Sequence, residues 1–404
     1  MRTIHLEGTT LEGGGQLLRL ATTLSSLTST PIHITSIRGK RSGGGGLKSQ
    51  HLTSVQWLGS ACNARISGAG LKSKEIMFKP SKERRRDWTK GGEVLIKQNT
   101  PGSVNLIFQA VLPFMLFAVG KGREVDRIKV KIIGGTNVSN SPSCEYVEQC
   151  LLPMLQRIGI PRIDTEVHSR GWSQGNARLG SVTYTFTPLQ NKLPAFHLVE
   201  RGDIESVKAT ILAPTDSEHL FRDELDVYFD RYASKIFGSS SAGVEVTFED
   251  SQHEKRYYLL LVATTTTGIK LGSDWLFDQG VRAGKADAVV SHLVKKVMGD
   301  LIKEVEHGGC VDEYMRDQLV VFQAMAEGYS KIYGGKSQGK LKLPSLHART
   351  AYWVAKEIID VDFDEGGGCE GIGFDPCEDV QRKSEASGII EGIQNLHVAD
   401  RVAS

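Results

Sequence analysis

The first residue that could do chemistry is His347, in "KLPSLHARTAYWVAKEII", directly after a proline and at the start of an apolar pattern with helical spacing. Ser345 stands where a helix N-cap belongs, so the pattern predicts a helix that begins beside the histidine. The positive end of a helix dipole lowers the pKa of an imidazole and favours its neutral form, which is a nucleophile. His347 is therefore the reactive group of an enzyme, a structural residue of a helix start, or a buried imidazole of the core.

A glycine-rich loop, "LEGGGQLLRL", precedes another predicted helix, which carries Arg19. Glycines permit close backbone approach, and the free N–H groups of a helix N-terminus suit an anion such as phosphate. Glu12 is a sensible ligand for a hard divalent cation beside such a site, or simply an acid near a helix N-terminus. No GK[ST] follows, so this is not a P-loop, and a plain tight turn is the alternative. The three candidate phosphate-binding glycines are Gly13, Gly14 and Gly15.

A second loop, "SIRGKRSGGGGLKSQHL", carries Arg38, Lys40, Arg41 and Lys48 between a predicted strand and a predicted helix. Guanidinium groups bind phosphate through two parallel hydrogen bonds, and the glycines would let the loop close on a polyanion. The alternative is a disordered surface loop. Two such loops in similar places favour a shared phosphate site.

Composition indicates a soluble globular protein, with 404 residues, 40% hydrophobic and 24% charged. The most apolar run, "LIFQAVLPFMLFAVG", is too short to span a bilayer and predicts a buried helix, and no secretion signal is evident, so we expect an intracellular protein. The six cysteines contain no CxxC pair, and we expect them to be reduced and structural. None of the eleven histidines has zinc-ligand spacing.

Charge is nearly balanced at +2 overall but unevenly distributed. The segment 71–90 has eight Lys or Arg against three acids, with "KERRRD" at its centre, whereas twelve acids face three bases from Glu357 onward. The basic segment is a solvated loop, an RNA contact or a nuclear import signal.

The order of predicted elements repeats along the chain. Strand, helix, strand, helix, strand, strand describes "TIHLEG" to "KEIMFKP" and again "GEVLIKQ" to "SVTYTFTP". A modified third copy contains the helices "KADAVVSHLVKKVMGDLIKEV" and "VDEYMRDQLVVFQAMAEG" and the helix at His347.

Between copies two and three lies a small α/β segment, and the strand that begins at Arg256 could belong to either side of that boundary. The predicted fold class is α/β (α+β), with a large domain of three repeated sheet-plus-two-helix units and a smaller inserted α/β domain. We expect these parts at 1–189, 190–280 and 281–375, followed by a flexible acidic tail at 376–404.

Six motifs occur together, "EGGGQLLR", "SIR…QHL", "IFQAVLP", "YMRDQL", "LHARTA" and "CEGIG", and in this order they resemble the RNA 3′-terminal phosphate cyclase family up to about Phe374. The resemblance implies the same three-repeat fold with an insert. It also implies an ATP-dependent enzyme, of ligase type, that converts an RNA 3′-phosphate end to a 2′,3′-cyclic phosphate. In such an enzyme His347 would attack the α-phosphorus of ATP, and the AMP would pass to the RNA 3′-phosphate before the 2′-OH displaces it.

The same resemblance implies roles for residues that spacing alone leaves open. Arg19, Arg38 and Arg41 would neutralise phosphate charge, and Glu12 would coordinate Mg²⁺ or Mn²⁺. Positions that match the family's nucleotide pocket are Gln50, Gln109, Tyr314, Asp317 and Gln318. Without the resemblance, Gln109 and Gln318 are ordinary polar residues of amphipathic helices and Asp317 a surface acid. The expected partners are ATP and RNA 3′-phosphate ends, with no membrane and no obligate protein partner, and the expected location is the nucleus.

One departure from the family's pattern is the four-glycine run in the basic loop, which usually has a proline and fewer glycines. A related branch of the fold is non-catalytic and acts in ribosome biogenesis, but it lacks both "EGGG" and the histidine, which this chain retains. That branch is the alternative function. A carboxyvinyl transferase has a similar repeated unit but does not resemble the glycine and "QHL" motifs.

Overall fold

The computed structural model describes residues 2–41, 43–81, 88–118, 127–238, 243–281 and 284–376. The segment "KERRRD" and the acidic tail beyond Pro376 lie outside these ranges, so what the sequence predicts for them stays a prediction. Within these ranges, no helix combines the length and the apolar character needed to cross a membrane. The five cysteines that are described are free and buried.

The first unit follows the predicted order of strands and helices. Its sheet has the order β1-β2-β4-β3, with β1 and β2 parallel and the other pairs antiparallel. A helix between β1 and β2 makes their parallel pairing possible, because parallel neighbours need a long crossover. The elements are β1 (Ile4–Glu7), α1 (Gly15–Thr28), β2 (Ile32–Thr35), α2 (Ser49–Ala61), β3 (Arg65–Ser67) and β4 (Ile76–Lys79).

The second unit repeats this topology, with the sheet order β5-β6-β8-β7 and only β5 and β6 parallel. Two sheets with the same order and the same directions confirm the predicted repeat. The elements are η1 (Lys90–Gly92), β5 (Glu93–Lys97), α3 (Val104–Phe117), β6 (Ile128–Gly134), α4 (Cys144–Tyr146), η2 (Val147–Leu151), α5 (Leu152–Arg157), β7 (Asp164–Ser169) and β8 (Gly180–Phe186).

The third unit has a sheet of order β17-β14-β9 among the described residues, with β9 and β14 parallel. Its first strand precedes the insert in the chain, so the insert interrupts this unit. The elements are β9 (His197–Leu198), α8 (Glu313–Met325), β14 (Glu327–Ile332), β15 (Lys336–Ser337), β16 (Lys340–Leu341), α9 (Leu346–Ile359) and β17 (Gly368–Ile372).

The insert is a sheet of order β11-β10-β12-β13 covered by two helices. The strand that begins near Arg256 is β12, which pairs with β10 and β13 and so lies inside this sheet. Two segments pack with a different unit from the one that the sequence predicts. Helix α7, which was expected in the third copy, packs on α6, β12 and β13 of the insert. Strand β9, which lies in the range expected for the insert, pairs with β14 of the third unit. The predicted boundaries at 189, 280 and 375 stay predictions. The elements are β10 (Ile204–Ala213), η3 (Thr215–Ser217), α6 (Glu218–Phe237), β11 (Gly243–Asp250), β12 (Tyr258–Thr265), β13 (Lys270–Leu276) and α7 (Ala286–His307).

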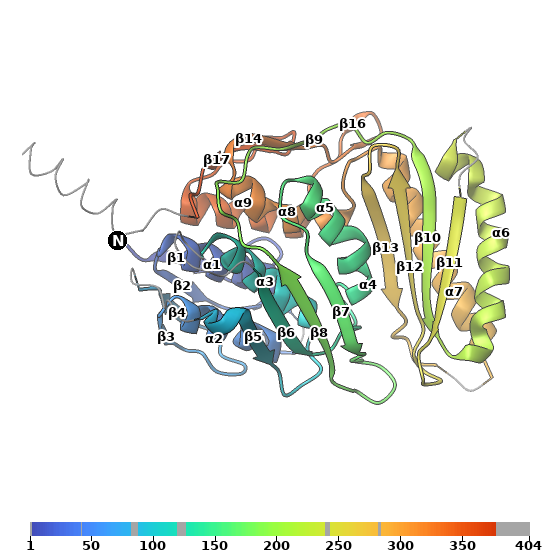
Figure 1. Cartoon of the computed structure of the whole chain (residues 1–404), viewed down its shortest axis with the longest axis horizontal. Helices are drawn as coiled ribbons and strands as arrows, with labels where there is room; N and C mark the ends of the chain where they lie inside the picture. Colours follow the sequence, from blue (N-terminus) through green and yellow to red (C-terminus); the bar gives the residue numbers. More distant parts are fainter. Residues whose placement is uncertain are drawn as a thin grey trace, which may run out of the picture.

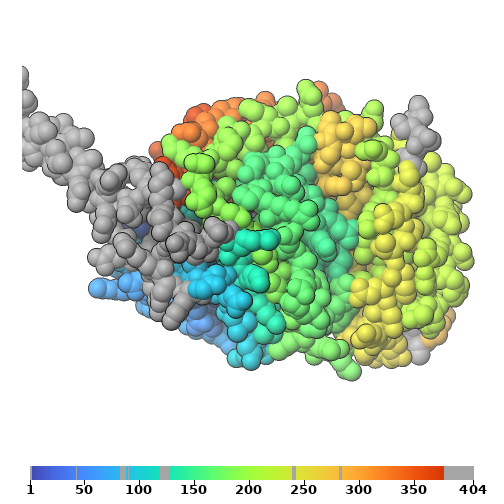
Figure 2. All heavy atoms as spheres, in the orientation of Figure 1, coloured from blue at the N-terminus to red at the C-terminus, as the bar shows by residue number. Residues whose placement is uncertain are grey.

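The helices of the three units pack against one another in the middle of the large domain, and the insert forms one end of the molecule (Figure 1). Helix α1 contacts α2, α3 and α9, and α8 contacts α3 and α9. In α3 every side chain except Gln109 is buried, which confirms the predicted buried helix. On the face drawn in Figure 2, green residues of the second unit fill the middle, between the blue first unit and the yellow insert. This packing brings several helix N-termini together.

Candidate active site

Two adjoining cavities, of about 440 and 860 Å³, lie where these helix N-termini meet. First-turn residues of α1, α2, α3, α8 and α9 line them. Helix N-termini attract anions, because their unpaired N–H groups and dipoles are positive, so cavities lined in this way are suited to a polyanion. The residues common to both cavities are Arg19, Arg41, Leu106, Asn140 and His347.

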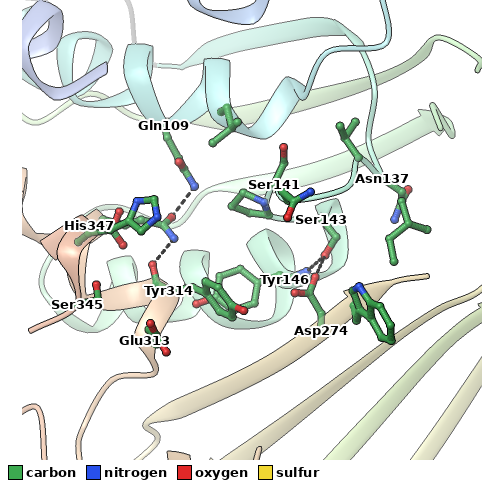
Figure 3. A pocket seen from close by; sticks show the side chains of 18 of the residues that line it. Gln109, Asn137, Ser141, Ser143, Tyr146, Asp274, Glu313, Tyr314, Ser345 and His347 are labelled. Atoms are coloured by element: carbon green, nitrogen blue, oxygen red, sulfur yellow. Dashed lines mark hydrogen bonds between the residues drawn. The ribbon is translucent and has the colours of Figure 1, made fainter. Parts of the chain in front are cut away.

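His347 is the second residue of α9, and the Ala348 N–H donates to Oγ of Ser345 over 3.2 Å, which confirms the predicted cap. The imidazole is about half exposed, at 49%, and faces the cavity (Figure 3). Partial burial, together with the nearby charges of Arg19 and Arg41, lowers the pKa of His347 below its usual 6.5. The side chain is therefore neutral and accessible at neutral pH, as a nucleophile must be.

Glu12 reaches the same point from the glycine-rich loop. Its carboxylate is 5% exposed, pairs with Arg41, and has Oε1 3.8 Å from Nε2 of His347. The other oxygen accepts the Gly14 N–H over 2.9 Å. A Cβ on Gly14 would overlap this carboxylate, and Gly13 adopts a positive φ of 64°. Gly13 and Gly14 thus position Glu12, whereas Gly15 lines the larger cavity itself.

Arg19 on α1 and Asp317 on α8 both line the smaller cavity and interact electrostatically. Burial lowers the pKa of Arg19 to about 10, and the charge of Asp317 opposes that shift. Burial raises the pKa of Asp317 to about 7, and Arg19 opposes it. A cation that keeps its charge in an enclosed space attracts phosphate strongly, because water screens it less than at the surface.

The polar residues of α8 and α3 form a short chain of hydrogen bonds. Nε2 of Gln109 donates to Oε1 of Gln318 over 2.7 Å, and Nε2 of Gln318 donates to the carbonyl oxygen of Tyr314 over 2.6 Å (Figure 3). Tyr314 is 53% exposed, and its ring meets that of Tyr146 edge-on at 6.3 Å. The structure therefore offers a flat, accessible ring in the cavity that His347 also lines.

The basic loop closes the larger cavity. Arg38 donates to the Gly46 carbonyl over 3.1 Å, and Gln50 accepts the Ser103 N–H over 3.3 Å. Gly46 needs a positive φ of 76°, and a Cβ there would lie only about 2.3 Å from the Lys72 carbonyl, a contact no side chain tolerates. At least one glycine of the four-glycine run is therefore required by the packing of this loop.

Sequence reasoning missed three residues of this region. His51 is 3% exposed, and burial, helped by Arg19 and Arg38, lowers its pKa to about 3. The "QHL" motif after the basic loop was the signal that could have identified it. Thr350, whose Oγ1 accepts the Glu12 N–H over 3.2 Å, lies one turn after His347. Asp274, on β13 of the insert, lines the smaller cavity, and no local pattern marks it.

Comparison with known proteins shows which family this chain belongs to. A profile of the family described as RNA 3′-terminal phosphate cyclase matches residues 10–364. A protein of that name from Desulfurococcus amylolyticus is 31% identical, over 93% of this chain and all of the relative. Another from Staphylothermus marinus is 31% identical over 89% of this chain and 93% of its own length. A third, from Drosophila melanogaster, is 29% identical over 92% and 97%. The match spans all three units and the insert, so this chain belongs to the RNA 3′-terminal phosphate cyclase family.

Proposed function

We propose that this chain is a catalytic member of the family, which uses ATP to convert RNA 3′-phosphate ends to 2′,3′-cyclic phosphates through an AMP bound to His347. One observation carries the proposal. A neutral, half-exposed imidazole faces a cavity that also contains Arg19 and Arg41, at the meeting point of several helix N-termini. A nucleophile, a site for phosphate charge and a carboxylate, Glu12, thus occur together.

The proposed reaction has the three steps that the resemblance to the family implies. Nε2 of His347 attacks the α-phosphorus, so that a P–N bond forms while the bond to pyrophosphate breaks. An oxygen of the RNA 3′-phosphate then attacks the same phosphorus, and the P–N bond breaks as a P–O–P link forms. Finally the 2′-OH attacks the 3′-phosphorus, loses its proton, and releases AMP. Each covalent intermediate replaces one difficult displacement by easier ones.

The cations of the site have distinct places in these steps. Arg19 and Arg41 line both cavities, so in this proposal they neutralise the phosphates of ATP at the imidazole. Arg38, Lys48 and Gln50 line only the larger cavity, as Glu12 does. We assign this cavity to the outer phosphates of ATP and, once pyrophosphate has left, to the RNA 3′-phosphate. Preorganised positive groups stabilise the charge that develops during phosphoryl transfer.

Glu12 is the residue that would hold a divalent cation. No cluster of three or more metal-ligating side chains exists within the described ranges, so protein groups alone make no complete cation site. A single carboxylate fits Mg²⁺ or Mn²⁺, because Mg²⁺ commonly takes one or two carboxylates and completes its shell with water and substrate phosphates. The cation would offset charge on the departing pyrophosphate. It would also compete with Arg41 for Glu12.

The test uses α-labelled ATP and Mg²⁺. Protein with an acid-labile, base-stable label is expected, and His347→Ala should lose it. His219→Ala, on the exposed side of α6 in the insert, is the matched histidine control and should label normally. A companion reaction with 3′-phosphate RNA should yield phosphatase-resistant ends. Equal labelling of His347→Ala would refute the mechanism, and RNA binding with neither label nor cyclisation would favour the non-catalytic, ribosome-biogenesis role. A nuclear location stays a prediction from the resemblance.

A further inference from the structure

The insert contributes one wall of the smaller cavity, at the end away from His347. Strand β13 supplies Asp274, and the loop between β6 and α4 supplies Asn137, Ser141 and Ser143 (Figure 3). The proposed chemistry uses the other end, where Arg19, Arg41 and His347 lie. A carboxylate is a poor neighbour for phosphate, so the Asp274 end suits a different part of the ligand.

The position of Asp274 in β13 places its side chain on the face of the strand that is turned to the second unit. Side chains two residues apart on a strand share a face. At Gly272, on the same face, a Cβ would lie 2.6 Å from Sγ of Cys150 and 2.7 Å from the Tyr146 ring. Strand β13 is therefore pressed against α4 and η2 at that point, and Asp274 lies on the face that the second unit covers.

Two hydroxyl groups fix one oxygen of Asp274. Oδ2 accepts from Oγ of Ser143 over 2.8 Å and from the hydroxyl of Tyr258 over 2.9 Å. Within the described part of the chain, Oδ1 accepts no hydrogen bond from another group. Burial raises the pKa of Asp274 to about 6, so the group is ionised at pH 8. A charged oxygen that is held in place and faces a cavity is a ready acceptor for an N–H of a ligand.

Tyr314 lines the same cavity as Asp274 and His347. Its half-exposed ring meets that of Tyr146 edge-on, and Asp274 is among the charges that raise the pKa of its hydroxyl. Aromatic rings stack nucleobases. Lys296, which also lines this end, pairs with Asp300. A nucleotide with its α-phosphorus at His347 and its base on Tyr314 would place the base in the part of this cavity that Asp274 also lines.

We propose that Asp274 selects the nucleotide by accepting a hydrogen bond from the 6-amino group of adenine. This rests on the proposed function, since it assumes that a nucleotide binds with its phosphates at His347. A 6-oxo purine would place a carbonyl oxygen against the carboxylate, and the two acceptors repel. Guanine could pair through N1–H and N2–H only with both oxygens, and Oδ2 is already taken by two donors. The insert domain thereby supplies base specificity to a site whose reactive groups come from the large domain.

The experiment measures nucleotide binding rather than labelling. In the His347→Ala background, which prevents covalent reaction, the affinities of ATP, ITP and purine riboside triphosphate are measured by calorimetry at pH 8 with Mg²⁺. A hydrogen bond to a charged group favours ATP over both analogues by roughly tenfold or more. Adding Asp274→Asn should bring the three affinities within about threefold of one another, a loss of coupling that a purely structural role would not cause. Asp226→Asn, exposed on α6, is the matched control and should keep the preference.

Equal affinity of the parent for ATP and purine riboside triphosphate would overturn the inference, even if Asp274→Asn fails to fold. So would an Asp274→Asn protein that loses affinity for all three equally. The two hypotheses fail separately. A protein that labels His347 equally with ATP and ITP keeps the cyclase mechanism and loses the base assignment. A protein that never self-labels but shows the Asp274-dependent preference for ATP keeps the base assignment and loses the cyclase mechanism.

Discussion

Nε2 of His347 lies 3.8 Å from Oε1 of Glu12, and the Glu12 N–H donates to Oγ1 of Thr350, one turn after the histidine. The two residues come from opposite ends of the chain and are joined because α1 packs against α9. The hydrogen bond from the Glu12 N–H to Thr350 fixes the position of the carboxylate relative to His347, because both Thr350 and His347 belong to α9. A change in that contact should therefore affect both.

The pH dependence of self-adenylylation should reflect the low pKa of His347. Partial burial, Arg19 and Arg41 disfavour the imidazolium, so the neutral nucleophile persists as the pH falls below 6.5. The decline in the single-turnover rate of labelling from α-labelled ATP that belongs to His347 should have its midpoint below pH 6.5. A midpoint at or above 6.5 would contradict the assigned environment.

The ionisation of Asp317 must be separated from that of His347 in this pH profile. Burial raises its pKa to about 7, so its ionisation changes over the same pH range. In Asp317→Asn any inflection near pH 7 should disappear, while the acidic limb that belongs to His347 remains.

Glu12→Gln should separate metal binding from the structure of the loop. Glutamine can still accept the Gly14 N–H but has no charge for Mn²⁺ or for Arg41. We expect the Mn²⁺ concentration for half-maximal labelling to rise about tenfold or more, since one charged ligand is lost. If the variant is inactive, Mn²⁺ binding in the presence of ATP, measured by electron paramagnetic resonance, gives the same comparison. An unchanged metal requirement would remove Glu12 from the metal site.

The sequence was sufficient for the repeated unit because its cues are local. Alternating apolar residues such as Ile32 and Ile34 mark a strand, and the proline and serine before His347 mark a helix start. The structure has both. The two four-stranded sheets repeat one order, which a repeated element pattern predicts. The glycine loop and His347 were recognised as possible chemistry on the same local grounds.

The sequence alone does not predict which distant residues lie close together in the folded chain. Asp274 lies in a strand with ordinary alternation, and only the packing of Gly272 against Tyr146 turns it toward the cavity. Strand β9 has two residues, and its partner β14 follows the insert in the sequence. No periodicity therefore reveals that β9 belongs to the third unit. These relationships depend on tertiary contacts between distant segments, which propensity and spacing do not contain.

His51 should make the protein less stable in mild acid. Its pKa is about 3 in the folded chain and about 6.5 when unfolded, so below pH 6.5 only the unfolded state takes up the proton. Its contribution is complete above 6.5 and is lost as the pH falls. Between pH 6 and 5 this costs about 1 kcal/mol. His51→Asn can keep the acceptor for the Lys48 N–H without the titration. The gap in unfolding free energy between wild type and variant, from urea titrations, should shift by that amount. A constant gap would show that His51 can be protonated in the fold.

Thr350→Val should loosen the join between the glycine loop and α9. The buried hydroxyl accepts the Glu12 N–H, and valine leaves that N–H without its partner at a cost of roughly 1–3 kcal/mol. Thr22→Val is the matched control, because its buried hydroxyl only donates to carbonyls of its own helix. Urea unfolding and labelling should both be impaired in Thr350→Val and much less in Thr22→Val. Equal effects in the two variants would mean that the contact with Glu12 contributes nothing specific.

Gly15→Ala should damage the site without removing a functional group. A Cβ at Gly15 would lie 2.6 Å from Nε2 of His51 and 3.0 Å from a guanidinium nitrogen of Arg19, so both side chains must move. Displacements near 1 Å in a phosphate site cost about a hundredfold in rate. Labelling by α-labelled ATP should fall by about that factor, with a smaller loss of ATP affinity. Gly299→Ala, in α7, has open space at the new Cβ and should leave labelling unchanged while stabilising the helix by about 0.5–1 kcal/mol. Normal labelling by Gly15→Ala would mean that the positions of His51 and Arg19 do not limit the reaction. In that case the first turn of α1 would contribute only its N–H groups and its dipole.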